Sequence, residues 1–266
     1  MPLNHEKLVV YRDALRFSVK VGLWVDGWGD RHAVSDQLMR AAGSVVENIA
    51  FASASYTGEK IKYIEYAIGS ALECAACLDV ACTKRLMIDS SCINEKRELS
   101  RHVGMLVALR RSWLKPSPVV NEDPPEYDTR QEVLFQHEKL DVYQTSLEVV
   151  RGLTSFRELA GIATTAFRRI DEPATSMVLN IAEGNGRFLD SEKRRFFEIS
   201  LESAIKLAAR LDVYSARGTI SIEDTHNCKA LIERVASMLS VMIDRPRKEY
   251  STKLTSGLTS EFVARC

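Results

Sequence analysis

The chain has 266 residues, with 36 basic and 36 acidic side chains, 45% apolar residues and 27% charged residues. This balance is typical of a soluble globular protein, and the length predicts two domains that each bury a core. No apolar run is long enough to span a bilayer, and the charged N-terminus lacks the apolar stretch of a secretory signal, so we expect a cytoplasmic protein without a membrane contact. The zero net charge gives no general support for nucleic-acid binding, because no excess of positive charge is available to release counterions.

An internal repeat is the strongest feature of the sequence. Residues 5–11 recur as residues 137–143 with six of seven positions identical, an offset of 132. The same offset places Asn48 on Asn180, and one inserted residue then shifts the offset to 133. Since self-similarity of this kind marks repeated structural units, we predict two copies of one unit.

The repeat and the composition together predict four regions. Four prolines and several acidic residues between the copies indicate a linker, and the polar C-terminal segment without periodicity indicates a flexible tail. The predicted regions are the first unit at 1–115, the linker at 116–136, the second unit at 137–245 and the tail at 246–266.

Apolar residues recur at steps of three and four through the first copy, which predicts amphipathic helices. Helices are expected at about 7–25 and 35–52, with the first turn between residues 21 and 30. A third helix should carry the stripe from Ile61 to Leu78, and a fourth the stripe from Leu99 to Leu114.

The second copy repeats this pattern, with one irregularity. Gly218 is suited to end the third helix, and Ser221 with Asp224 resembles the start of the fourth. Pro173 lies inside the second helix, where it should cause a kink or a restart. Strand signals are nearly absent, so we predict an all-α protein of two tandem antiparallel up-down-up-down four-helix bundles.

Three motifs in this chain resemble a known family. They are the His-Glu-Lys-Leu opening of both copies, residues 180–187 (Asn-Ile-Ala-Glu-Gly-Asn-Gly-Arg) and the aromatic segment 196–200. They resemble the four-helix-bundle family found in intervening sequences of bacterial 23S ribosomal RNA, which looks related to the accessory variability protein of diversity-generating retroelements. The resemblance implies a bundle that self-associates, in relatives into rings, and that has no catalytic activity. In the retroelement relatives it implies a basic surface that contacts reverse transcriptase and nucleic acid.

The most specific motif differs between the copies. The second copy has Glu183 and Gly184, whereas the first has Phe51 and Ala52 at these positions, which alters the predicted loop after the second helix. The matching Asn48 and Asn180 lie near the end of a predicted helix. There an amide can bond the last free carbonyls, so we favour a structural role over a ligand contact.

Two groups of residues invite a metal site. Glu65 matches Glu198, but di-iron bundles need four glutamates and two Glu-x-x-His pairs, and the chain has one such pair, Glu223 and His226. The second group is a cysteine cluster, for which zinc binding or redox pairing are alternatives to simple packing: Cys74, Cys77, Cys82 and Cys92. Because the spacing of these cysteines is irregular, we favour packing as reduced thiols, and no metal or cofactor is expected.

Basic residues around the second helix of the second copy carry a nucleic-acid hypothesis. They are Arg168, Arg169, Arg187, Lys193, Arg194 and Arg195. Lys193, Arg194 and Arg195 fall in the first turn of a predicted helix, where positive charge opposes the helix dipole. The alternative interpretation is a solvated helix face, since acidic residues are interleaved with them.

Two functions remain open at this point. The first is a noncatalytic scaffold or adaptor that acts through self-association or a protein partner, using aromatic surface positions such as Trp24, Trp28 and Trp113. The second is a nucleic-acid-binding accessory protein. No nucleophile, base and orienting group occur at recognisable spacing, so neither an enzyme nor a small-molecule substrate is expected.

Overall fold

The computed structural model describes residues 3–29, 32–55, 57–114, 134–160 and 164–244. Within these ranges the chain forms α-helices and two short 3₁₀ helices, and no strand, which confirms the all-α prediction. Residues 116–133 of the predicted linker and the predicted tail lie outside the described residues. The last residues assigned to the linker, 134–136, lie against the second bundle, where Phe135 is buried.

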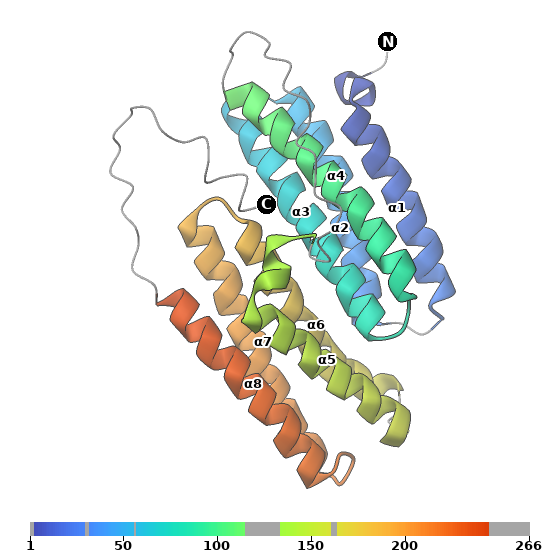
Figure 1. Cartoon of the computed structure of the whole chain (residues 1–266), viewed down its shortest axis with the longest axis vertical. Helices are drawn as coiled ribbons and strands as arrows, with labels where there is room; N and C mark the ends of the chain where they lie inside the picture. The colour runs from blue at the N-terminus through green and yellow to red at the C-terminus, as the bar shows by residue number, and fades with distance from the viewer. Residues whose placement is uncertain (1–2, 30–31, 56, 115–133, 161–163, 245–266) are drawn as a thin grey trace.

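Each copy forms one closed bundle (Figure 1). The first bundle consists of η1 (Asn4–Lys7), α1 (Val9–Gly27), α2 (Ala33–Ala54), α3 (Thr57–Thr83) and α4 (Asp89–Leu114). The second consists of η2 (Gln136–Lys139), α5 (Asp141–Ala160), α6 (Thr164–Gly186), α7 (Asp190–Ala216) and α8 (Ile222–Ile243). Consecutive helices pack side by side, and the fourth helix of each copy returns to the first, as an up-down-up-down bundle requires.

The ends of the helices follow local chemistry in most places. Gly218 takes a left-handed φ of 68° after α7, as predicted, and Arg85 takes the same conformation (φ 59°) at the matching position after α3. Ser221 caps α8, because its hydroxyl accepts a hydrogen bond from the amide of Asp224. The first turn begins later than predicted, since α1 continues through Val21, whose side chain is fully buried in the core.

Helix α6 passes through Pro173 without interruption, so the predicted restart does not occur. Proline has no amide hydrogen, and the carbonyl of Arg169, four residues earlier, therefore lacks its helical donor. The guanidinium of Arg210 on α7 donates a hydrogen bond to that carbonyl instead. A side chain from the neighbouring helix thus replaces the missing backbone bond.

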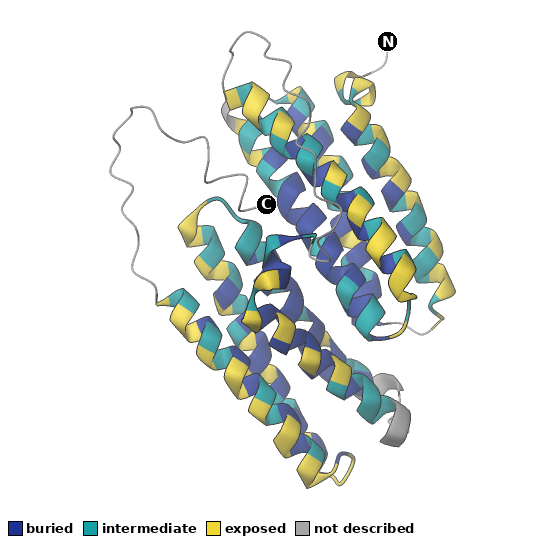
Figure 2. Cartoon of the chain, in the orientation of Figure 1, coloured by how far each residue is buried: buried dark blue, intermediate teal, exposed yellow. Residues whose placement is uncertain are grey.

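The two bundles also pack against each other and share one continuous core. Helix α3 lies between them and contacts α5 and α6, while α2 contacts α6 (Figure 1). Figure 2 shows α3 as largely buried. Close packing depends on Gly186, because a Cβ atom there would lie 2.0 Å from Cδ1 of Leu72 across the interface.

One described segment, Glu59–Thr83 of α3, has the length and hydropathy that could cross a membrane. In this protein, however, 72% of its most apolar window is buried. A helix that is packed on both sides by two bundles needs an apolar surface almost all round, which accounts for its composition.

Candidate functional site

The polar contacts between the bundles form the most elaborate site in the described part of the chain. At its centre, Lys84 at the end of α3 forms a buried ion pair with Asp171 of α6, and both side chains are 3% exposed. The Lys84 ammonium also donates to the hydroxyl of Thr175 at 2.9 Å. Burial lowers the pKa of Lys84, while the charge of Asp171 opposes that shift.

Asp171 has a second role at this contact. Its Oδ2 accepts a hydrogen bond at 3.1 Å from the amide of Ala33, the first residue of α2. The first amides of a helix have no partner within the helix, so Asp171 caps α2 from the other bundle. One carboxylate therefore ties together α6, α2 and the end of α3.

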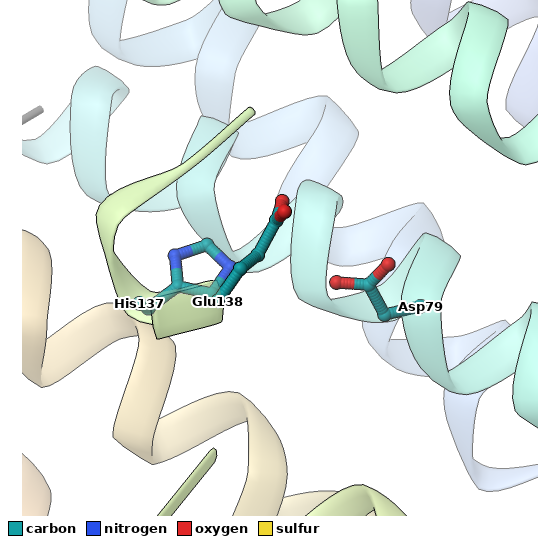
Figure 3. Close-up of side chains that lie close together, drawn as sticks. All are labelled: Asp79, His137 and Glu138. Carbon is teal, nitrogen blue, oxygen red and sulfur yellow. The ribbon is translucent and has the colours of Figure 1, made fainter. Parts of the chain in front are cut away.

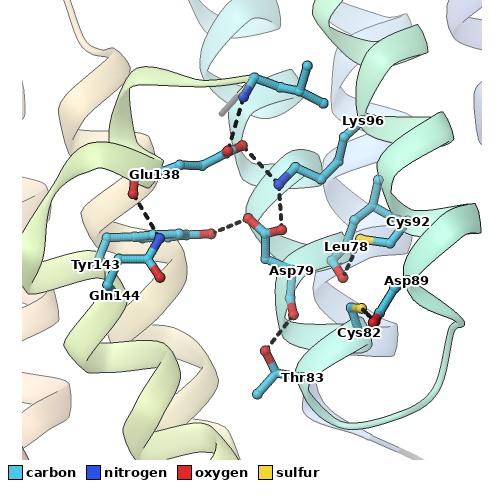
Figure 4. Close-up of polar contacts among 11 residues, drawn as sticks. Leu78, Asp79, Cys82, Thr83, Asp89, Cys92, Lys96, Glu138, Tyr143 and Gln144 are labelled. Atoms are coloured by element: carbon cyan, nitrogen blue, oxygen red, sulfur yellow. Dashed lines mark hydrogen bonds and ion pairs between the residues drawn. The ribbon is translucent and has the colours of Figure 1, made fainter. Parts of the chain in front are cut away.

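A second network joins the bundles nearer the middle of α3 (Figure 4). The Lys96 ammonium of α4 lies 2.5 Å from Oδ1 of Asp79 and 2.8 Å from Oε1 of Glu138. The hydroxyl of Tyr143 donates to Oδ2 of Asp79 at 2.8 Å, and the amide of Leu134 donates to Oε2 of Glu138 at 3.1 Å. Burial lowers the pKa of Lys96, but Asp79 and Glu138 outweigh it and raise that pKa above its usual range.

Three side chains of this network could in principle hold a metal ion. Asp79, His137 and Glu138 bring their ligand atoms within 4.8 Å of one another, the one such group among the described residues (Figure 3). All four carboxylate oxygens of Asp79 and Glu138 already take part in a hydrogen bond or an ion pair. Lys96 supplies the positive charge that a metal would bring. The residues therefore fit an ammonium better than a divalent cation.

His137 is held in this network without a hydrogen bond to its Nε2 atom. Its ring packs against Phe135 and Tyr143, with centroids 5.6 and 4.7 Å away. Burial, assisted by the charge of Lys96, lowers the pKa of His137 to about 3. The imidazole is therefore neutral at physiological pH.

A third contact involves Arg187, which we predicted to contact nucleic acid. Its side chain is 10% exposed, forms an ion pair with Glu183, and places its guanidinium 5.4 Å from the ring centroid of Tyr66 in the first bundle. A Cβ atom at Gly69 would lie 3.1 Å from the guanidinium carbon, so glycine there makes room for it. Arg187 is occupied within the interface between the bundles.

The other predicted basic residues lie at two ends of the second bundle. Arg168 and Arg169 lie near the start of α6, and Arg168 contacts Asp36 of the first bundle at 3.4 Å. Lys193, Arg194 and Arg195 lie in the first turns of α7, which is next to the end of α6. The structure therefore does not bring the six predicted residues together on one surface.

The paired asparagines have equivalent structural contacts. Asn48 and Asn180 each donate to the carbonyl four residues earlier, those of Ser44 and Ser176, at 2.8 and 2.7 Å. These carbonyls lie inside the helices and are not the last free ones that we predicted. Each serine hydroxyl also contacts a serine of the following helix, so the same pair of residues joins the second and third helices in both bundles.

The paired glutamates have different partners in the two bundles. Glu65 accepts hydrogen bonds from Arg110 at 2.6 and 2.8 Å, whereas Glu198 pairs with Arg194 at 2.8 Å on the surface. Glu183 and Gly184 lie in the last turns of α6 and not in a loop. A Cβ atom at Gly184 would lie 2.8 Å from the Phe197 ring, so the motif glycine permits close packing of α6 on α7.

The predicted cysteine and tryptophan positions are engaged in packing. Three of the four clustered cysteines are buried and the fourth is half-buried, and none belongs to a group of metal ligands among the described residues: Cys74, Cys77, Cys92 and Cys82. Burial raises the pKa of each of these thiols. The three tryptophans are partly buried against the core: Trp24, Trp28 and Trp113.

Sequence reasoning missed the residues that join the bundles, among them Asp79, Lys84 and Asp171. A signal for one pair was present, because Asp79 and Lys96 recur as Asp212 and Lys229 at the offset of 133. Charged residues that persist in both copies, while most of their neighbours differ, indicate a shared polar contact.

The geometry defines the protein as a tandem pair of four-helix bundles joined by a buried polar interface. A family model described as 23S rRNA-intervening sequence protein matches residues 6–108 and 138–241. The chain therefore belongs to this family, with two tandem copies, as the motifs indicated. Comparison with curated proteins and with solved structures finds no match.

Proposed function

We propose that the protein is a noncatalytic helical scaffold that associates with further copies of itself, head to tail. The direction of the contact between its bundles carries the proposal. Helix α3 of the first bundle packs against α5 and α6 of the second, whereas the corresponding α7 contacts neither α1 nor α2 among the described residues. Such a contact is heterologous, and it leaves one face of each kind uncovered: α7 of the second bundle, and the α1 side of the first, whose α2 already contacts α6.

The uncovered side of the second bundle carries a counterpart of the Asp79–Lys96 pair, with the acid on α7 and the lysine on α8. Asp212 and Lys229 match Asp79 and Lys96 and form their own ion pair at 2.8 Å. In the first bundle, Lys96 binds the carboxylate of Glu138 and Asp79 accepts a hydrogen bond from the hydroxyl of Tyr143. In the second bundle, no described residue from outside that bundle contacts the Asp212–Lys229 pair.

The groups that would complete this contact recur near the N-terminus. Glu6 matches Glu138 and Tyr11 matches Tyr143. Glu6 is exposed and accepts a hydrogen bond from the amide of Leu3, much as Glu138 accepts one from the amide of Leu134. Another chain could therefore present the same carboxylate and hydroxyl to the charged pair on α7.

Apolar side chains support the same contact. On α7, Ile205 is 60% exposed and Val213 is 46% exposed, whereas their counterparts on α3, Leu72 and Val80, are 3% and 0% exposed. Leu15 on the uncovered α1 is 41% exposed. Large apolar side chains gathered on one surface are typical of protein interaction sites.

Two charge reversals test the direction of assembly. Glu6→Arg should break the N-terminal face and Asp212→Arg the α7 face, so each variant alone should be a monomer, while the unaltered protein forms larger species. An equimolar mixture should form a complex of two chains, because each variant keeps the face that the other lacks. Light scattering coupled to size-exclusion chromatography measures these masses.

The control is Glu148→Arg, which makes the same charge change at an exposed position of α5. It should assemble like the unaltered protein. A monomeric unaltered protein at high concentration would overturn the proposal, as would a mixture of the two variants that stays monomeric.

Nucleic-acid binding is a second candidate, favoured by the exposure of Arg194 and Arg195 at the start of α7. Replacing Lys193, Arg194 and Arg195 by alanine should leave helicity intact and abolish binding of structured RNA and duplex DNA, which should also weaken steeply with salt. Fluorescence anisotropy at two salt concentrations checks both effects. Unchanged binding in the triple variant would overturn this assignment of the site.

A further inference from the structure

A pocket of about 630 Å³ opens between the beginning of α6 and the end of α7. Its lining contains four arginines, Arg168, Arg169, Arg210 and Arg217, and a single acidic residue, Glu172. The lining therefore carries three net positive charges in a protein whose net charge is zero, and Asp36 of the first bundle pairs with one of them, Arg168, at 3.4 Å. Such a concentration of guanidinium groups in a concave site favours a multiply charged anion.

Two of these arginines are held in place by neighbours. Nε of Arg168 lies 3.2 Å from Oε1 of Glu172, and Nη1 of Arg210 lies 4.0 Å from Oε2 of the same residue. Arg210 also donates to the carbonyl of Arg169 that Pro173 leaves without a helical donor. These contacts fix the position of two guanidinium groups before any ligand arrives, which reduces the entropy lost on binding.

The other two arginines carry the excess charge. Arg169 and Arg217 are both exposed, and neither guanidinium has an ion pair or a hydrogen bond with a described residue. Guanidinium groups can bind phosphate through two parallel hydrogen bonds each, so several of them around one pocket suit phosphate oxygens better than a single carboxylate.

The first bundle shows how the same place accepts an anion. Arg217 matches Lys84, whose ammonium pairs with the carboxylate of Asp171 from the second bundle. The counterpart of Asp171 in the first bundle is Met39, which has no charge. If the first bundle of a second chain docked on α7 as the second bundle docks on α3, it would place Met39 near Arg217, and no carboxylate would pair with the arginine.

We propose that this arginine pocket binds phosphate groups of a ligand that carries two or more of them. The inference goes beyond the scaffold function and does not depend on self-association, because all of the arginines belong to one bundle. The shared chemistry is phosphate recognition, and its source is either a small polyphosphate or the backbone of RNA.

The test uses the full-length protein and two probes, inorganic pyrophosphate followed by calorimetry and a labelled single-stranded RNA followed by anisotropy. The pocket variant combines Arg169→Ala with Arg217→Ala. The control combines Arg151→Ala with Arg234→Ala, which removes the same charge from exposed positions of α5 and α8 that belong to neither candidate site. Circular dichroism checks that both variants keep their helicity.

We expect pyrophosphate to bind and its affinity to fall at least about tenfold in the pocket variant and less than about twofold in the control. Absence of pyrophosphate and RNA binding at low salt would overturn the proposal, as would an equal loss in both variants. RNA binding that is lost in the pocket variant identifies the nucleic-acid backbone as a source. RNA binding that stays unchanged in the pocket variant, while pyrophosphate binding is lost, leaves the pocket to a small polyphosphate.

Discussion

Two histidines at matching positions of the repeat have opposite environments. His137 is 1% exposed within the interface between the bundles, whereas His5 near the N-terminus is half-exposed. The residue type and the Glu-Lys-Leu that follows it are the same, so the difference arises mainly from what covers each turn. Burial gives His137 an energetic link to pH.

This link predicts an acid sensitivity. The pKa of His137 is about 3 in the folded protein, below its ordinary value of 6.5, so its stabilising contribution is complete above pH 6.5 and is lost as the pH falls from there towards 3. When the pH falls from neutral to about 5, the unaltered protein should lose about 2 kcal/mol more unfolding free energy than the His137→Phe variant, which has no imidazole to protonate. Urea unfolding at both pH values measures it. An unchanged pH dependence in the His137→Phe variant would contradict the assignment.

At the scale of single elements, α6 shows how a helix tolerates an internal proline. The sequence around Pro173 predicts a kink or a restart, because the local rule considers only backbone donors. The structure supplies the missing donor from Arg210 on the neighbouring helix. A helix in a bundle can therefore keep a residue that an isolated helix would not.

The compensation predicts a coupling between these two residues. Arg210→Met should lower the free energy of unfolding by about 1 kcal/mol, because the carbonyl of Arg169 loses its donor. In a Pro173→Ala background the backbone amide returns, and the same change should cost much less. A double-mutant cycle by denaturant unfolding measures the coupling, and additive effects would show that Arg210 does not replace the amide.

The interface also determines how the whole molecule unfolds. Since the Lys84–Asp171 pair is buried and caps α2, Asp171→Asn should leave a buried ammonium without its counter-charge and cost about 3–5 kcal/mol. We expect one calorimetric transition for the unaltered protein and two for the variant, one per bundle. Combining Lys84→Met with Asp171→Leu should recover much of the lost stability, because it removes both charges. A single unchanged transition in Asp171→Asn would show that the pair does not couple the bundles.

Helix positions and the repeat were predictable because they depend on local patterns. Apolar residues at steps of three and four identified the third and fourth helices of each copy, the repeat extended the first two helices to the second copy, and Gly218 and Ser221 marked ends that the structure confirms. The candidate site was predictable only in part. Arg168 and Arg169 do line the arginine pocket, but Arg210 and Arg217 join them from a helix about forty residues further along the chain, and no local pattern connects the two segments.

The sequence by itself determined that this protein is two copies of one helical bundle, since periodicity and self-similarity are properties of the chain. Only the tertiary structure decided which of two equivalent residues contacts the other bundle. Asp79 and Asp212 occupy the same position of the repeat, yet Asp79 binds Tyr143 across the interface and Asp212 is exposed. The physical reason is that the two bundles pack through different faces. The α3 face of the first bundle is covered by the second, whereas the equivalent α7 face of the second bundle has no contact with the first among the described residues.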